Sequence, residues 1–232
     1  MERLVAIITA RGGSKRIPRK NIKPFCGRAI IEYSIEAALE SCIFDEVMVS
    51  TDDEEIVEIA RKEGASVPFL RSEMMANDYA TTTEVLKEVI LEYEKREIRF
   101  DGGCCIYPTA PFVTGDKLRE AMRLLKETDA DSVMPVVQYS FPPQRGVSVK
   151  DGYVKINNPE KYMVRSQDLD PVYHDAGQFY CFNIKRFLET DRLVGEKCIP
   201  VIVPDTEVQD IDNEEDWIIA EMKYKLMRSK SD

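Results

Sequence analysis

Residues 4–21 read LVAIITARGGSKRIPRKN, in which a short apolar run leads into a loop that is rich in glycine and basic side chains. The run Leu4–Thr9 has the length and the unbroken hydrophobicity of a β-strand that is buried on both faces. Strands of this kind belong to parallel sheets, whose two faces are covered by helices. The stretch therefore predicts an α/β fold in which residues 4–9 form an inner strand.

The alternation of strand and helix patterns continues from this run to residue 137. Apolar runs predict further strands at residues 46–51, 66–70, 103–107, 131–137, 178–183 and 199–203. Helical spacing of apolar residues predicts helices at residues 30–41, 54–62, 83–95, 116–127 and 213–226. This order predicts a mostly parallel sheet with helices on both of its faces.

Residues 138–176 interrupt the alternation. The segment is rich in Pro, Tyr, Asn and Asp, and it has no long helical pattern. It is too short for an independent domain. We therefore predict a single domain over residues 1–232, from which this segment extends as an arm that packs on a second copy of the chain in a homodimer.

The overall charge limits the class of partner. The chain has 232 residues, with 32 Lys and Arg against 42 Asp and Glu, which gives a net charge of −10. This balance argues against a general nucleic-acid or membrane surface. No apolar run reaches the ~18 residues that a membrane-spanning helix needs, and the MERLVAIITA start lacks the cationic region of a secretory signal. We expect a soluble, cytoplasmic protein without nucleic-acid or membrane partners.

Six cysteines occur in the chain without a CxxC pair or a Cys/His ligand cluster. They are Cys26, Cys42, Cys104, Cys105, Cys181 and Cys198. In a cytoplasmic chain of this size, we expect reduced and mostly buried thiols. The vicinal pair Cys104–Cys105 lies within a predicted strand, which indicates packing rather than redox chemistry.

The loop after the first strand has the chemistry of a phosphate site. In an open α/β sheet, ligands bind beyond the carboxyl ends of the strands, where this loop begins. Gly12 and Gly13 allow close approach of the backbone to an anion, and Ser14 adds a hydroxyl donor. The loop gathers five basic residues in an acidic chain, namely Arg11, Lys15, Arg16, Arg19 and Lys20. The alternative is that these residues form only a solvated basic turn.

The motif ARGGSKRIPRKN resembles the signature loop of the cytidylyltransferases that activate sugar acids, and the likeness extends over nearly the whole chain. The resemblance implies a Rossmann-like nucleotidyltransferase fold whose loop wraps the triphosphate of CTP. It implies that Arg11 and Lys20 are the chief catalytic phosphate partners and that Asn21 reaches the nucleoside. The family's usual glycine before Ile-Pro is Arg16 here. The implied nucleotide-binding residues of the loop are Ala10, Arg11, Gly12, Gly13, Ser14, Lys15, Lys20 and Asn21.

The segment RSEMMANDYATTTEVL, residues 71–86, resembles the part of this family that holds the cytosine base. Arg71 and Thr82 match the base-contacting positions. Cytosine needs donors to its O2 and N3 and an acceptor for its N4 amine, which Arg71 and backbone groups can supply. The alternative is that residues 81–83 cap the following helix, and a capping turn leaves backbone groups available to a ligand.

The segment VQDIDNEEDW, residues 208–217, places Asp210 and Asp212 two positions apart. In an extended chain both carboxylates point to one face, and Ile211 points to the other. A carboxylate pair beside a triphosphate suits Mg²⁺, which prefers oxygen ligands. These aspartates match the family's metal ligands, and we expect Asp212 to be catalytic. The alternative is that Asp212 is only the N-cap of the last helix.

The second half of the chain resembles the members of this family that act on pseudaminic acid. The motifs SFPPQR, RSQDLDPVYHDAGQFY and EVQDIDNEEDW carry this likeness, and Tyr107 stands where N-acetylneuraminate enzymes usually have glutamine. Arg165 could clamp the substrate carboxylate with two hydrogen bonds. The other substrate-binding candidates are Tyr107, Gln144, His174, Asp175, Gln178 and Tyr180. A lone histidine such as His174 more often makes a structural hydrogen bond than it catalyses.

The resemblance implies a reaction between CTP and a nonulosonic acid that yields the CMP-sugar and pyrophosphate. The 2-hydroxyl of the sugar would attack the α-phosphate in line, while the loop, Arg11, Lys20 and Mg²⁺ stabilise the developing charge. The alternatives are the same reaction on legionaminic or N-acetylneuraminic acid, and a catalytically silent nucleotide-binding regulator. A dinucleotide-binding oxidoreductase is disfavoured because no GxGxxG motif is present.

Overall fold

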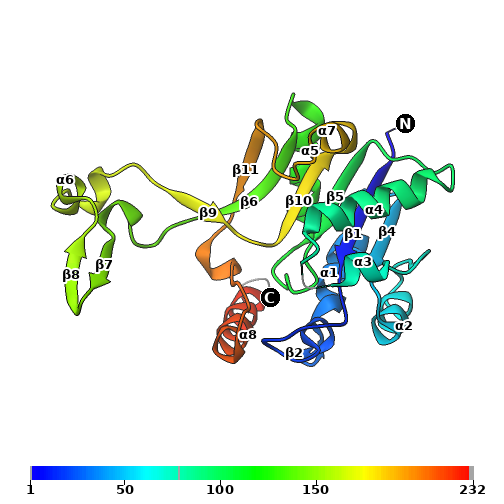
Figure 1. Cartoon of the computed structure of the whole chain (residues 1–232), viewed down its shortest axis with the longest axis horizontal. Coiled ribbons are helices and arrows are strands. Elements are labelled where there is room, and N and C mark those ends of the chain that lie inside the picture. The colour runs from blue at the N-terminus through cyan, green and yellow to red at the C-terminus, as the bar shows by residue number, and fades with distance from the viewer. Residues whose placement is uncertain (1, 78, 230–232) are drawn as a thin grey trace.

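The computed structural model describes residues 2–77 and 79–229, and within them a central seven-stranded sheet in the order β11-β6-β10-β5-β1-β4, with β9 also paired to β6 (Figure 1). Its strands are β1 (Leu4–Thr9), β4 (Glu46–Ser50), β5 (Gly102–Ile106), β6 (Ser132–Gln138), β9 (Tyr173–Asp175), β10 (Phe179–Asn183) and β11 (Cys198–Ile202). Two-stranded sheets are formed by β2 (Pro24–Phe25) with β3 (Arg28–Ala29) and by β7 (Val147–Lys150) with β8 (Tyr153–Ile156). The first strand has the bounds that the sequence predicts.

The sheet is mostly parallel, as predicted, with two antiparallel members. β1 pairs in parallel with β4 and β5, and β11 pairs in parallel with β6. β9 and β10 run antiparallel to successive parts of β6, because the chain leaves the sheet after β6 and must return in the opposite direction. The two are separated at residues 176–178, where Gly177 adopts a positive φ of 62°. This break lies beside the candidate site described below.

Helices cover both faces of the sheet, as predicted. Ala6 and Ile8 of β1 lie in one buried cluster with apolar side chains of α1, α2 and α5, and Val5 and Ile7 lie in another with those of α4 and α7. The alternation follows from the two-residue period of a strand. The helices are α1 (Ile30–Ser41), α2 (Glu54–Lys62), α3 (Glu73–Ala76), α4 (Thr82–Glu94), α5 (Gly115–Glu127), α6 (Pro159–Tyr162), α7 (Ile184–Thr190) and α8 (Glu214–Arg228). None of them is long and apolar enough to cross a membrane.

A third buried cluster connects the loop after β1 with the end of the chain. Ile17 from the loop packs with Phe25, with Ile211 from the segment before α8, and with Trp217 from α8 itself. All four side chains are at most 4% exposed. The glycine-rich loop and the segment that carries Asp210 and Asp212 are therefore held side by side by one apolar contact.

The predicted arm leaves the sheet after β6 and returns as β9 (Figure 1). It carries the β7–β8 hairpin, in which every residue is exposed, and the short helix α6. Its exposed apolar side chains include Phe141, Val149, Tyr153, Val154 and Met163. That the chain forms a single domain, and that this arm contacts a second copy, stay predictions.

One local prediction is wrong, and one alternative is excluded. Residues 66–70 form no strand but only a single bridge from Ser66 to Met48, because Pro68 has no N–H with which to continue the ladder. The N-cap of α8 is Asn213, whose side chain accepts from the N–H of Asp216, so Asp212 does not cap the helix. The side chain of Asp216 in turn accepts from the N–H of Asn213, which completes a capping box.

The six cysteines are all free thiols. Cys104, Cys105 and Cys181 are buried, as expected for residues of the central strands, whereas Cys42 is exposed at the end of α1. Burial raises the pKa of the Cys105 thiol to about 12. A thiol with so high a pKa is a poor nucleophile, which agrees with the packing role that the sequence indicates.

Candidate active site

The loop after β1 forms one wall of a cavity of about 610 Å³ at the carboxyl ends of β1 and β5. Its size is in the range of small-molecule sites in proteins. The lining comes from the loop, from Arg71, from the start of α4 and from the end of β5. It consists of Thr9, Arg11, Gly13, Ser14, Lys15, Arg16, Lys20, Asn21, Arg71, Ala80, Thr82, Val85, Tyr107, Pro108 and Thr109.

Three of the predicted nucleotide-binding residues, Gly12, Ala10 and Asn21, have structural roles within the protein. The N–H of Gly12 donates to Oδ1 of Asp52 at 3.0 Å, and a Cβ atom at this position would lie 2.6 Å from Oδ2 of Asp53. The close approach that requires glycine here is therefore to a protein side chain. Ala10 is fully buried beneath the loop. Asn21 lines the cavity and also donates to the carbonyl of Arg11 at 2.9 Å, which ties the two ends of the loop together.

The basic residues of the loop divide into two groups. Arg19 forms ion pairs with Asp53 and Glu55 and does not line the cavity. Arg19 is not among the predicted nucleotide-binding residues, and carboxylates at the start of α2 neutralise its charge. The four that line the cavity are Arg11, Lys15, Arg16 and Lys20. Their charges make this wall of the cavity an electropositive surface.

Arg71 is buried at the base of the same cavity, with only 8% of the residue exposed. Its Nε donates to Oγ of Ser50 at 3.1 Å and its Nη2 donates to the carbonyl of Ser50 at 2.7 Å. Burial lowers the pKa of Arg71, because the charged guanidinium loses solvation. Nearby carboxylates, Asp52 first among them, oppose this lowering. These two hydrogen bonds hold the guanidinium in a fixed orientation at the cavity.

The start of α4 both caps the helix and borders the cavity, which are the two roles that the sequence left open. The side chain of Thr81 accepts from the N–H of Glu84 at 3.2 Å and caps the helix, and Glu84 completes the capping box. Thr82, the first residue of the helix, lines the cavity beside Tyr107. The capping turn therefore places this side chain and its neighbouring backbone within reach of a ligand.

A second cavity of about 610 Å³ adjoins the first and shares part of its wall. The shared residues are Arg16, Lys20, Tyr107 and Thr109. The remaining wall comes from the break between β9 and β10 and from the segment before α8. It consists of His174, Asp175, Ala176, Gly177, Val208, Gln209, Asp210, Ile211 and Asp212. Two cavities that meet at a lysine and an arginine can hold two reactants with their charged groups in contact.

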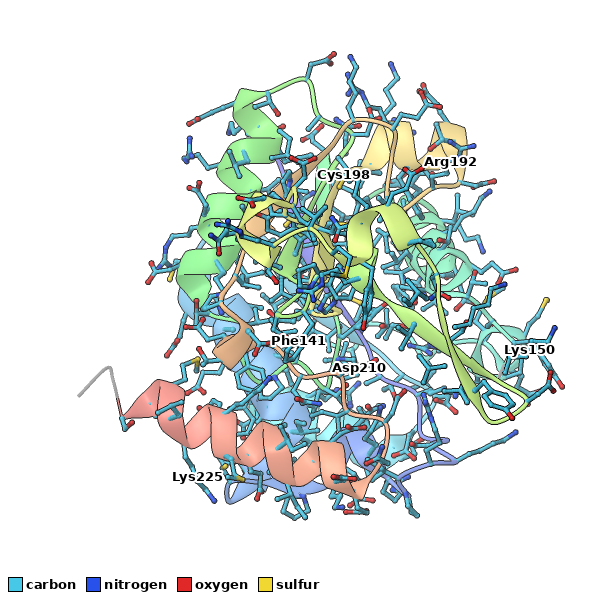
Figure 2. The ribbon with its side chains drawn as sticks, turned by 90° about the vertical axis from the view of Figure 1, so that its left-hand side faces the viewer. Phe141, Lys150, Arg192, Cys198, Asp210 and Lys225 are labelled. Carbon is cyan, nitrogen blue, oxygen red and sulfur yellow. The ribbon has the colours of Figure 1, made fainter. Side chains whose placement is uncertain are left out.

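Asp210 and Asp212 both border the second cavity, and Ile211 between them is buried, as the two-residue period predicts. Asp210 lies on the extended segment that leads into α8 (Figure 2). Lys20 donates from Nζ to the carbonyl of Ile211 at 2.7 Å, and Nη1 of Arg16 lies 2.5 Å from Oδ2 of Asp212. Burial lowers the pKa of Lys20, and the two aspartates oppose this effect. The described residues contain no group of three or more His, Cys, Asp or Glu side chains placed to hold a metal.

Asp175 is held rigidly at the edge of the second cavity. Its Oδ2 accepts from the hydroxyl of Tyr180 and its Oδ1 accepts from the N–H of Gly177, each at 2.7 Å. Burial raises the pKa of the Tyr180 hydroxyl, and the neighbouring carboxylate raises it further. Tyr180 is itself buried behind Tyr107, with 5.5 Å between the ring centroids. Tyr180 therefore positions a carboxylate and does not line the cavity.

His174 lines the same cavity, and its ring packs on Tyr139 with 4.7 Å between the centroids. Its Nδ1 lies 2.9 Å from the carbonyl of Asp175. Gln178 is buried behind the wall, where its Nε2 donates to the carbonyl of Glu207 at 2.6 Å. The backbone carbonyl of Gln178 accepts from the N–H of Tyr107 at 2.8 Å, so this residue braces the wall rather than faces the cavity.

Gln144 and Arg165 are not brought together with the other predicted residues. Both lie in the arm, outside the lining of the two cavities. Gln144 donates from Nε2 to the carbonyl of Asp170 at 2.8 Å, which is also in the arm. Several residues that line the cavities are not among those predicted from the sequence. For Pro108 and Thr109 a signal existed, because they follow the carboxyl end of a parallel strand.

A family model described as Cytidylyltransferase matches residues 5–183 of the chain. The chain belongs to the cytidylyltransferase family. It is 40% identical over 223 residues to the pseudaminic acid cytidylyltransferase of Campylobacter jejuni, and the match covers 96% of each chain. It is 33% identical over 233 residues to the CMP-N,N'-diacetyllegionaminic acid synthase of Legionella pneumophila, with 97% of each chain covered.

Solved cytidylyltransferases share the fold. CMP:2-keto-3-deoxy-manno-octonic acid synthetase, solved in complex with CTP, superposes with a TM-score of 0.69 at 17% identity and covers 98% of this chain and 99% of its own. The 4-diphosphocytidyl-2C-methyl-D-erythritol synthase of Anaerococcus prevotii has a TM-score of 0.65, also at 17% identity, over 97% of this chain and 99% of its own. The fold and the nucleotidyltransferase class that the sequence predicts are confirmed.

Proposed function

We propose that this cytidylyltransferase transfers CMP from CTP to the anomeric 2-hydroxyl of pseudaminic acid and releases pyrophosphate. The observation that carries the proposal is the pair of adjoining cavities, which meet at Lys20 and Arg16. The choice of pseudaminic acid is supported by the relative from Campylobacter jejuni, which is 40% identical to this chain. The second candidate is the same reaction on a legionaminic acid, which the Legionella pneumophila relative favours at 33% identity.

CTP occupies the first cavity in this proposal. Its triphosphate lies along the loop, where Gly13 and Ser14 offer hydrogen-bond donors and where Arg11, Lys15 and Lys20 supply positive charge. The cytosine ring lies at the far end, against Arg71 and Thr82. Arg71 is fixed by its hydrogen bonds to Ser50, so it can donate to the base without losing side-chain entropy on binding.

The sugar acid occupies the second cavity. Asp175 is fixed by Tyr180 and Gly177, and it accepts hydrogen bonds from hydroxyl or amide N–H groups of the sugar. His174 and Tyr107 provide further polar contacts and ring surface. Lys20 and Arg16 at the shared wall attract the carboxylate of the sugar and the phosphates alike. The 2-hydroxyl then faces the α-phosphate across the boundary of the cavities.

Asp210 and Asp212 are the residues that would hold Mg²⁺. They fit this cation because they are carboxylates in the wall of the second cavity, open to solvent, and Asp212 contacts Arg16 of the wall that the two cavities share. A Mg²⁺ ion with only two protein ligands takes its other ligands from water and phosphates, as is usual for this metal. When bound, it would neutralise charge on the α-phosphate and on the departing pyrophosphate.

The chain's own residues contribute mainly by positioning and by charge. Holding the hydroxyl and the α-phosphate in contact replaces a bimolecular encounter by an internal step. Arg11 and Lys20 stabilise the negative charge that moves onto the pyrophosphate. The reaction needs no covalent enzyme intermediate, and the buried cysteines take no part. Measurement of pyrophosphate release with CTP and a panel of nonulosonic acids tests the proposal, which fails if pseudaminic acid gives no product.

The nucleotide cavity should select the pyrimidine. We expect pyrophosphate release with ATP or GTP to be at least about tenfold slower than with CTP, because in this proposal the end of the cavity lined by Arg71, Val85 and Tyr107 is shaped for a single ring. UTP is the matched control, since it has the same ring size but presents a carbonyl where cytosine has its N4 amine. Slow turnover with UTP would show that hydrogen bonding to the base, rather than ring size, gives the selectivity. Equal rates with ATP and CTP would contradict the assignment of Arg71 and Thr82 to cytosine binding.

We further propose a cytoplasmic homodimer in which the arm of one copy packs on the other and brings residues such as Gln144 and Arg165 toward the partner's sugar cavity. The support is that an isolated two-stranded hairpin is barely stable in water, yet the β7–β8 hairpin is exposed over its whole length and carries exposed apolar side chains. The six free thiols agree with a reducing compartment.

Light scattering after size exclusion should give a mass near twice the 26.6 kDa of the chain at micromolar concentration. We expect Val149→Glu, in the exposed hairpin, to shift the protein toward monomer, because a buried charge opposes association. Val194→Glu is the control, since Val194 is an exposed valine outside the arm. A fully active wild-type monomer would contradict this assembly.

A further inference from the structure

An ion pair joins the two halves of the candidate active site. Nη1 of Arg16, in the loop after β1, lies 2.5 Å from Oδ2 of Asp212, in the segment before α8. The side chains remain 67% and 40% exposed. Arg16 lines both cavities, whereas Asp212 lines only the second. The ion pair therefore links a residue of the proposed nucleotide cavity to one of the proposed metal ligands.

The backbones on either side of this ion pair are fixed. Ile17, the neighbour of Arg16, and Ile211, the neighbour of Asp212, are 0% and 2% exposed and belong to the same buried cluster. Lys20 adds a hydrogen bond to the carbonyl of Ile211. Breaking the ion pair thus requires only rotation of two partly exposed side chains. Exposed side chains change rotamer on a timescale of picoseconds to nanoseconds, so the pair can open without rearrangement of the fold.

A divalent cation and Arg16 compete for the same carboxylate. A cation bound at Asp212 would share Oδ2 with the guanidinium or lie beside it, and two positive charges a few ångströms apart repel each other. Arg16 already borders the nucleotide cavity, so a bound triphosphate offers its guanidinium an alternative partner with more negative charge than one carboxylate.

We propose that Arg16 is a positioning residue that holds Asp212 in the nucleotide-free enzyme and exchanges it for the phosphates of the bound nucleotide, which frees Asp212 for the divalent cation. The inference rests on the proposed function, because it assigns the nucleotide to the first cavity and the cation to Asp210 and Asp212. Its consequence is positive coupling, in which nucleotide and cation each raise the affinity of the other. Arg16 stays paired with an anion in both states.

The test measures equilibrium binding without the sugar acid, so that no turnover occurs. Binding of Mn²⁺ to the nucleotide-free protein is followed through the electron paramagnetic resonance signal of the free ion. We expect Arg16→Gln to bind Mn²⁺ about threefold to tenfold more tightly than wild type, because the competing charge is gone. By calorimetry in excess chelator, we expect the same variant to bind CTP about threefold to tenfold more weakly, because a phosphate partner is lost.

Two further variants separate this role from a general charge effect. Lys23→Gln removes another cation of the same region, which pairs with Glu214 at 2.5 Å and lines neither cavity, and it should change neither constant. The double variant Arg16→Gln/Asp212→Asn should show no gain in Mn²⁺ affinity, because the gain acts through the carboxylate of Asp212. Melting temperatures of all variants report whether the fold is intact.

Unchanged or weaker Mn²⁺ binding by folded Arg16→Gln overturns the inference. If wild type with CTP nevertheless binds Mn²⁺ more tightly than folded Asp212→Asn with CTP, the proposed metal site survives and only the role of Arg16 is lost. If wild type and Asp212→Asn bind Mn²⁺ equally in the presence of CTP, the metal ligands and the inference both fail. Tighter Mn²⁺ binding together with weaker CTP binding supports the exchange, since a merely structural ion pair would alter the melting temperature and leave both constants near wild type.

Discussion

Asp212→Asn is expected to reduce pyrophosphate release by about a hundredfold or more while the protein melts near the wild-type temperature. Asparagine lacks the formal charge that a hard cation requires, so the variant should lose most of its response to Mg²⁺. The substitution also breaks the partly exposed pair with Arg16, but such pairs contribute only ~0–1 kcal/mol to stability. Asp210→Asn should behave in the same way, and a chelator should stop the wild-type enzyme.

Asn213→Ala is the matched control for this prediction. Asn213, not Asp212, accepts the hydrogen bond from the N–H of Asp216 at the start of α8. Loss of such a cap costs ~1 kcal/mol, so this variant should melt at a lower temperature and keep its turnover at 25 °C. This result would show that Asp212 is needed for catalysis and that its neighbour Asn213 is needed for stability. Near-normal turnover and Mg²⁺ response in Asp212→Asn would exclude it as a metal ligand.

Lys20→Ala should lower kcat/KM by roughly tenfold to a hundredfold, and Arg11→Ala should have a similar effect. A lost hydrogen bond from a charged group to phosphate is typically worth ~1.5–3 kcal/mol, which converts to this range of rate. Lys20 lies at the shared wall of the two cavities, and Arg11 lines the first. Steady-state kinetics with CTP, at saturating sugar acid, gives the measurement.

Arg19→Ala is the control from the same loop. Arg19 is a cation one residue before Lys20, but it is paired with Asp53 and Glu55 of the α2 region and does not line the cavity. Its loss should leave kcat/KM close to wild type. If all three alanine variants lose activity equally, the loop needs its basic residues for folding. If Lys20→Ala and Arg11→Ala both turn over at the wild-type rate, the loop is only a solvated basic turn.

Short-range patterns predict much of the fold because they depend on neighbouring residues. β1, α1 and α2 have the bounds that hydrophobic periodicity predicts. The same logic applies to the carboxylate pair, since the two-residue period places Ile211 inward and both aspartates outward. The glycine-rich loop after a buried strand likewise indicates a ligand site at the carboxyl edge of a sheet.

The local patterns fail where several residues can satisfy the same requirement. Asp212 and Asn213 are both good N-caps by residue type, and only the backbone geometry assigns the cap to Asn213. Arg19 has the same charge as its neighbours in the loop, but α2 lies close enough to pair with it. Residue type alone does not separate these roles, because it contains no information about which partner is near.

The sequence by itself determined the α/β class, the position of the phosphate-type loop and the common face of Asp210 and Asp212, because each follows from the pattern of nearby residues. Only the tertiary structure decided that Lys20 reaches the carbonyl of Ile211, 191 residues further along the chain. It alone decided that β10 runs antiparallel between β5 and β6, and that the arm residues Gln144 and Arg165 lie away from the cavities. The physical reason is that packing of the buried cluster around Ile17 and Ile211, rather than any local preference, brings distant segments together.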